Sequence, residues 1–248
     1  GLVWEIDPNQ PICNVPHQFK GQKPGIHSSH IAYVAECLTA MALHSLLVGD
    51  EEHGRQAAAA FVNYYKLREP LIDQWNAMSD SEFGATPYNG SGAATCWRGM
   101  HGLVAHMNLG LGFDFSGKWM SPAQRDDMRR IIVKATYGRR PYGQDSTVRF
   151  RDVNWVTWDL PHYLALLTVE GLPGCDPEGL PADRETVRAF CDWGVDENGV
   201  VYESNGKTPG SLQFQTLSMI ALARRGENLF AHPHWRKFLE GQIGRAHV

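Results

Sequence analysis

Residues 151–158 combine an amide, a cation and aromatic rings near a predicted helix start. Asn154 and Trp158 are four residues apart, so on a helix they share one face. Arg151 and Trp155 add a positive charge and a second flat ring. Such a set can hold an anionic group and stack on an apolar ring face. Alternatively, an Asp or Asn at the start only caps the helix while the tryptophans pack inside.

A second stretch, residues 193–207, places a turn before a group of polar side chains. Residues 196–199, Asp-Glu-Asn-Gly, are typical of a tight turn between two helices. Tyr202, Glu203 and Lys207 follow in a predicted loop. These side chains either face a cleft or pin the loop. A tyrosine in a cleft can act as a base where nearby cations lower its pKa.

A third candidate group is formed by Trp97, Arg98 and His101. His101 follows Trp97 by about one helical turn, which gathers an aromatic ring, a cation and an imidazole near a helix start. A single histidine in a helix more often serves the core or the surface. His101 is a site candidate because a loop rich in glycine and asparagine, residues 84–93, leads directly into this group.

Composition and spacing exclude several classes of function. The net charge is −4 and the basic residues are scattered, so no electrostatic footprint for nucleic acid is present. No apolar run approaches the ~20 residues that span a bilayer. No set of His, Asp and Glu has metal-ligand spacing, and no phosphate-binding or dinucleotide motif occurs, so we expect neither metal nor cofactor. The five cysteines are expected to be buried free thiols, with one disulfide possible.

The elements that position these residues are predicted to be helices, since strand-type alternation is nearly absent. The clearest start is Ser121–Gln124, which aligns a capping serine, a first-turn proline and a capping-box glutamine. Asp50 is expected to cap the second helix, which should end before Pro70. Periodicity and end signals predict helices over residues 28–48, 51–69, 94–112, 122–138, 153–169, 183–193, 211–225 and 233–242.

The predicted order is helix, short turn, helix and longer loop, about four times over, without a sequence repeat. Such hairpins, with long loops on one side, are expected of an all-α toroid whose loops line a central cleft. A six-hairpin toroid needs about twelve helices. We therefore predict an (α/α)n toroid that is either complete or incomplete, and an incomplete one would be a fragment of a longer chain. Residues 1–27 form an extended lead-in and residues 28–248 the toroid domain.

The segment over residues 150–225 resembles the α/α-toroid polysaccharide lyases. It is most similar to the alginate lyase type, and less so to heparinase II/III and the chondroitin and hyaluronate lyases. Those families have an Asn-Asn-His-x2-Trp helix that neutralises a uronate carboxylate, matched here by Asn154 and Trp158. Their later Val-Asp-x-x-Gly-x4-Glu stretch is matched by Val195–Gly199 and, one residue closer to the glycine than in the family, by Glu203.

Two positions depart from the family pattern. Trp155 stands where the family has its histidine, and no tyrosine lies near residues 208–212, where the family has its catalytic one. Tyr202, a few residues earlier, is the substitute candidate. Asn154 is the functional residue that carries over directly.

The resemblance implies cleavage of a uronate-containing glycan by β-elimination. Asn154 would neutralise the carboxylate, and Tyr202 or His101 would act as base and acid. The implied substrate is an acidic polysaccharide or oligosaccharide, and this substrate class implies a secreted or periplasmic protein, although the chain shows no signal peptide. The expected substrate-binding residues are Trp97, Arg98, Arg151, Trp155, Trp158 and Lys207.

Two other functions fit the same sequence. An inverting glycoside hydrolase on this fold would draw a carboxylate pair from Asp152, Asp159, Asp196 and Glu203. A non-catalytic glycan-binding domain would use the same aromatic residues without any reaction.

Overall fold

The computed structural model describes residues 28–77, 100–137, 153–202 and 208–246. Within these ranges the chain forms eight α-helices, and its β pairing is limited to one bridge between Val195 and Val201. The prediction of an all-α chain is confirmed for this part. None of the described helices is long and apolar enough to cross a membrane. The chain divides into two units, residues 1–135 and 136–248, and each is described by itself.

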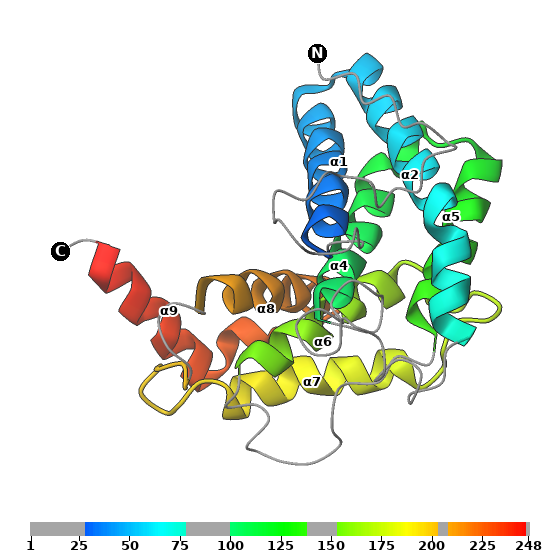
Figure 1. Ribbon diagram of the computed structural model, residues 1–248. Coiled ribbons are helices and arrows are strands. Elements are labelled where there is room, and N and C mark those ends of the chain that lie inside the picture. Colours follow the sequence, from blue (N-terminus) through cyan, green and yellow to red (C-terminus); the bar gives the residue numbers. More distant parts are fainter. Residues whose placement is uncertain (1–27, 78–99, 138–152, 203–207, 247–248) are drawn as a thin grey trace, which may run out of the picture. The chain divides into compact units, whose positions relative to one another are not determined.

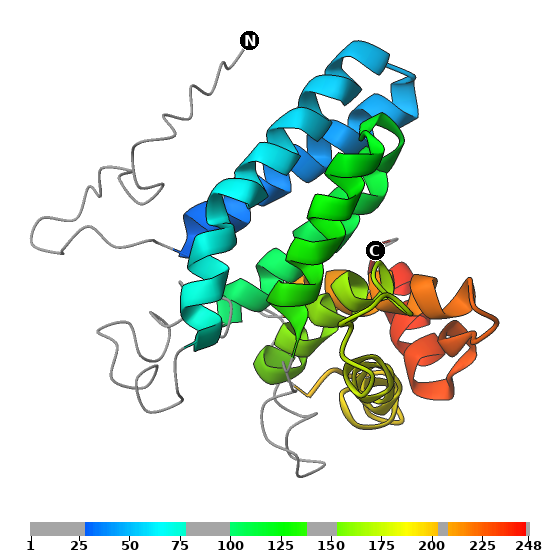
Figure 2. The ribbon, with the colours of Figure 1, turned by 90° about the vertical axis from the view of Figure 1, so that its right-hand side faces the viewer.

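The first unit is built from two helical hairpins. The helices α1 and α2 are joined through Gly49 and Asp50, and α4 packs against both (Figures 1 and 2). The first unit's elements are α1 (Ser28–Val48), α2 (Glu51–Ala77), α4 (Met100–Ser116), the short 3-10 helix η2 (Gly117–Trp119) and α5 (Pro122–Thr136), whose last residue falls in the second unit.

Two helix starts in the first unit form as predicted. The Asp50 carboxylate accepts the backbone N–H of His53 at 3.0 Å and so caps α2. At the start of α5, the Ser121 hydroxyl accepts the Gln124 N–H at 3.2 Å, and the Gln124 side chain accepts the Ser121 N–H at 2.8 Å. This reciprocal capping box fixes where α5 begins.

The second unit repeats the hairpin pattern. In it, α6 packs against both α7 and α8, and α9 contacts α7 (Figure 1). The prediction that a helix begins at Asp183 is wrong, because α7 begins at Gly179, and Asp183 lies inside it and is buried. The elements are α6 (Val153–Leu167), α7 (Gly179–Trp193), α8 (Thr208–Ala223), the 3-10 helix η4 (Leu229–Ala231) and α9 (Pro233–Ala246).

Nearly uncharged helices alternate with charged ones along the chain. Glu36, Asp114 and Asp159 are the sole charged residues of α1, α4 and α6, and α8 has none. By contrast, α2, α5, α7 and α9 each carry at least four. Within each unit the nearly uncharged helices contact one another, α1 with α4 and α6 with α8. Both pairs supply buried side chains to the interior, and α1 also has an exposed face that carries Met41, Leu47 and Val48.

Close packing of the first unit depends on Gly112 of α4. A Cβ atom at this position would lie 2.2 Å from the ring of Phe61 and 2.9 Å from the hydroxyl of Thr39. Both neighbours are buried, so neither has room to move away. Gly112, predicted to end this helix, instead lies within it; α4 continues to Ser116, and residues 94–99 lie outside the described residues.

The prediction that the second helix ends before Pro70 is wrong, because α2 continues to Ala77. The missing N–H of the proline costs one helical hydrogen bond. Contacts beyond it offset that loss: Ile72 is fully buried, and the Asn76 amide donates to the Lys134 carbonyl of α5 at 2.7 Å. A further correction concerns Cys37, which is exposed rather than buried.

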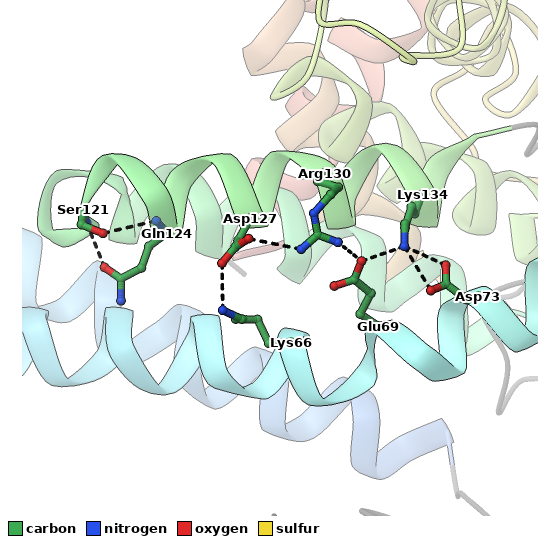
Figure 3. Close-up of polar contacts among 8 residues, drawn as sticks. All are labelled: Lys66, Glu69, Asp73, Ser121, Gln124, Asp127, Arg130 and Lys134. Carbon is green, nitrogen blue, oxygen red and sulfur yellow. Dashed lines mark hydrogen bonds and ion pairs between the residues drawn. The ribbon is translucent and has the colours of Figure 1, made fainter.

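A ladder of ion pairs joins the charged faces of α2 and α5 (Figure 3). Lys66 Nζ lies 2.8 Å from Asp127 Oδ2, and Lys134 Nζ lies 2.7 Å from Glu69 Oε1 and 2.9 Å from Asp73 Oδ1. Arg130 pairs with Glu69 from α5 as well. Glu69 thus receives two cations, and only 15% of its side chain is exposed. It is the centre of the ladder.

We predict that Glu69→Gln lowers the free energy of unfolding by roughly 1 kcal/mol, because two cations of α5 lose their shared carboxylate. Glu52→Gln is the matched control, since Glu52 is 65% exposed and pairs with Arg55 of its own helix. The control should change stability by no more than about 0.5 kcal/mol. Urea unfolding at low and high salt measures both variants. Equal losses would show that the ladder does not hold the two helices together.

Candidate functional site

The backbone of α6 carries three of the predicted site residues near its N-terminus. The helix begins at Val153, so Asn154 is its second residue and Trp158 lies one turn further on. Trp155 lies between them. The side chains of this turn are outside the described residues, so the capping alternative stays a prediction. The backbone alone places an amide-bearing residue at the positive end of a helix dipole, where anions are favoured.

The rest of α6 is anchored firmly in the second unit. Residues 160–166 are all buried, including Pro161 inside the helix. His162 contacts Asp183 of α7 at 2.6 Å and the backbone carbonyl of Thr136 at 3.0 Å. Sequence patterns did not predict the pairing of His162 with Asp183, because nothing local links two residues 21 positions apart.

The predicted turn after α7 is present, and it is held by hydrogen bonds within the turn and by one from α9. The Asp196 carboxylate accepts the N–H groups of Asn198 at 2.9 Å and Val200 at 2.7 Å. Donation from the Val200 and Asn198 amides holds the pKa of Asp196 below its usual value. Lys237 of α9 donates to the Glu197 carbonyl at 2.7 Å. The Asp196 carboxylate therefore serves the turn, and as a stabilised anion it is poorly suited to be a catalytic acid.

Gly199 brings this turn directly against α9. Its φ of +79° is in the left-handed region. A Cβ there would lie 2.5 Å from the backbone nitrogen of Phe238 and 2.6 Å from the carbonyl carbon of Lys237. Backbone atoms of a helix cannot move aside, so both the conformation and the space require glycine.

Tyr202 emerges from this turn with an exposed side chain. Its backbone N–H donates to the Gly194 carbonyl at 3.3 Å, next to the Val195–Val201 bridge. Tyr202 is 47% exposed, Val200 53% and Trp193 43%. Val200 and Tyr202 flank Val201, whose backbone forms the bridge with Val195. Trp193, which the sequence patterns did not single out, is a further exposed ring at the end of α7.

Several predicted site residues have side chains outside the described part of the structure. Glu203, the acid that follows Tyr202, is one of them. His101 is the second residue of α4, in the first unit, and its side chain is likewise not described. Four predicted binding residues also lie outside the described ranges: Trp97, Arg98, Arg151 and Lys207.

Two histidines of the second unit have partners that the sequence did not indicate. His232 Nε2 lies 3.0 Å from Asp192 Oδ1, and His234 Nδ1 lies 2.9 Å from the Val195 carbonyl oxygen. Their rings meet edge to face at 5.1 Å. Among the described residues, no group of three or more His, Cys, Asp and Glu side chains is arranged to hold a metal ion.

The charged groups around α6 and α7 pair with one another and do not lower the pKa of a neighbouring tyrosine below its usual value. Burial raises the pKa of Tyr163, and the guanidinium of Arg184 beside it offsets this only in part. Arg188 pairs with Glu227, whose carboxylate pKa is lowered by that contact. Tyr163 is therefore a poor candidate for a base, and Tyr202 is the exposed tyrosine that follows the turn.

No family model, curated protein or solved structure matches the chain.

We predict that Gly199→Ala lowers the free energy of unfolding by roughly 2–4 kcal/mol, through a strained φ and overlap with α9. Gly171→Ala is the matched control, because Gly171 has a φ of +76° but open space where its Cβ would be. It should cost about 1 kcal/mol, from conformation alone. Urea unfolding measures both. Equal losses would show that the turn is not docked on α9.

Proposed function

We propose that the chain is part of a polysaccharide lyase that cleaves a uronate-containing glycan by β-elimination. The observation that carries the proposal is the pairing, within one unit, of an amide-bearing helix start on α6 with an exposed tyrosine after a docked turn. The two belong to the sequence segment that resembles toroid lyases.

The start of α6 suits the neutralisation of a carboxylate. Removal of the C5 proton of a uronate develops negative charge beside a carboxylate that is already anionic. The positive end of the helix dipole lowers the energy of that charge, and the Asn154 amide is the additional donor in the proposal. Trp155 and Trp158 are the proposed stacking surfaces for the sugar rings.

Tyr202 is the proposed base, and it is also the proposed acid for the leaving oxygen O4. A base needs contact with its substrate, and a residue that is 47% exposed meets this need. Its backbone is fixed by the bond to Gly194 and by the turn docked on α9. Proton transfer depends on fixed geometry, so a docked turn is a suitable support. His101 remains the alternative acid or base in the proposal.

The proposed architecture is an α/α toroid, whether complete or partial. Its support is the alternation of nearly uncharged and charged helices within each unit, as expected when one ring of helices surrounds another. The proposed substrate class, an acidic glycan, goes with a secreted or periplasmic location. Of the two other functions, the hydrolase loses one proposed carboxylate, since Asp196 is engaged by the turn.

We predict that the 248-residue chain, mixed with a panel of uronate-containing polysaccharides, releases products that absorb in the ultraviolet through a new C4–C5 double bond. Tyr202→Phe should lower kcat about 100-fold or more, because the proton acceptor is lost. Tyr137→Phe, which alters another exposed tyrosine, should leave the rate unchanged. Reducing ends without absorbance would indicate a hydrolase instead, and binding without products a glycan-binding domain.

We predict that Asn154→Ala lowers kcat roughly 100- to 1,000-fold, as expected when a donor to a developing anion is removed. Asn154→Asp should lower it further, since a carboxylate would repel the uronate. Initial rates from ultraviolet absorbance measure both variants. The control is Asn63→Ala, at an exposed position of α2, which should retain the full rate. An Asn154→Ala enzyme as active as the original chain would remove Asn154 from the mechanism.

A further inference from the structure

The His162 ring is held between two hydrogen-bond acceptors inside the second unit. Its Nδ1 lies 2.6 Å from Asp183 Oδ2, and its Nε2 lies 3.0 Å from the carbonyl oxygen of Thr136. Only 3% of the His162 side chain and 1% of the Asp183 side chain are exposed. Both distances are those of formed hydrogen bonds, so each contact must contain a proton.

The donors and acceptors of this group fix how many protons it holds. A carbonyl oxygen only accepts, so Nε2 carries a proton and donates it to Thr136. An ionised carboxylate also only accepts, so either Nδ1 is protonated as well, or Asp183 is a neutral acid that donates to Nδ1. In both cases the pair holds one proton more than a neutral imidazole with an ionised aspartate. Without that proton, the lone pair of one ring nitrogen would face either the Asp183 carboxylate at 2.6 Å or the Thr136 carbonyl oxygen at 3.0 Å.

The titratable groups that the structure describes around this pair are engaged with other partners. Tyr163 follows His162 on α6 and Arg184 follows Asp183 on α7, and the two lie beside each other. Arg225 after α8 pairs with Glu170 after α6 at 2.9 Å. The residues of α8 that contact α6 and α7 through hydrogen bonds, Ser218 and Gln215, are neutral. No other histidine lies among these groups in the part of the chain that the structure describes.

We infer that His162 and Asp183 form a buried proton-binding site that positions α6, so that the anchorage of this helix depends on one bound proton. The inference rests on the proposed function in one respect: α6 carries Asn154 and Trp158, so loss of the proton withdraws support from the proposed carboxylate site. His162 is a positioning residue here and does not touch the substrate.

The sign of the pH dependence follows from the proton count. In the unfolded chain, histidine loses its proton near pH ~6.5 while aspartate is already ionised. Below this pH both states hold the proton, and its contribution to stability is fully present. Above it only the folded state holds the proton, so stability falls as the pH rises. The unfolding equilibrium constant then increases up to about tenfold per pH unit, whichever atom carries the proton.

The variant Asp183→Asn should keep both hydrogen bonds of His162 without needing the additional proton. The amide introduced at position 183 can donate to Nδ1 while Nε2 still donates to Thr136, so a neutral imidazole satisfies both contacts. This variant should fold and should lose the added pH dependence. His232→Gln is the matched control, since His232 forms a histidine–aspartate pair whose carboxylate is 58% exposed. It should keep most of the dependence seen in the original chain.

The test is urea unfolding of the 248-residue chain and both variants from about pH 5 to pH 9, together with ring-nitrogen NMR shifts of labelled histidine. We expect the stability of the original chain and of His232→Gln to fall above pH ~6.5 relative to Asp183→Asn. We also expect a doubly hydrogen-bonded His162 signal near neutral pH. Two outcomes would overturn the inference. One is a His162 ring that has one unprotonated nitrogen in the original chain and gives the same signal in Asp183→Asn. The other is an equal slope of stability against pH in all three proteins.

Lyase assays separate this inference from the proposed function. If the original chain is a lyase, Asp183→Asn should shift the alkaline limb of the pH profile of kcat to higher pH and leave KM unchanged. If no uronan is cleaved but the pH slopes differ as expected, the lyase proposal fails while the proton site stands. Cleavage with equal slopes would support the lyase and overturn the proton site. Neither unfolding nor NMR requires activity, so the two results are independent.

Discussion

Four helices with at most one charged residue each set the main constraint on this structure. Because α1, α4, α6 and α8 offer few charged side chains to water, packing against other helices is favourable for each of them. In both units two such helices contact each other, α1 with α4 and α6 with α8, although α1 keeps a face exposed at Met41, Leu47 and Val48. The close approach at Gly112 and the ladder between α2 and α5 are consequences of that arrangement.

Polar residues inside such helices need internal partners, and these partners fix the register of the packing. The Thr39 hydroxyl lies within hydrogen-bonding distance of the Ala35 and Asn108 carbonyls, the second of which belongs to α4. Ser218 of α8 donates to the Leu160 carbonyl, and Gln215 donates to the Val187 carbonyl of α7. Each of these three side chains joins two helices. His162 belongs to this set, and it differs in that its contacts also require a proton.

Local sequence signals correctly predicted the features that depend on contacts between residues close together in the sequence. The Ser121–Gln124 capping box and the turn at Asp196–Gly199 are each held by hydrogen bonds between residues two to four positions apart, and both form as expected. The continuation of α2 past Pro70 was missed because it depends on contacts such as that of Asn76 with Lys134, 58 positions away. The pairing of His162 with Asp183 was missed for the same reason. Sequence spacing carries little information about such tertiary contacts.

One of the two motifs that carry the resemblance to lyases, Val195–Gly199, is chiefly structural in this chain. Val195 is fully buried, Asp196 is held by backbone amides, and Gly199 is enclosed by α9. None of these three can also reach a substrate without giving up its contact. A chain can keep such a turn for the sake of α9 alone, whatever reaction it performs. Any chemistry in this segment therefore falls to residues outside Val195–Gly199, and in the proposal these are Tyr202 and Asn154.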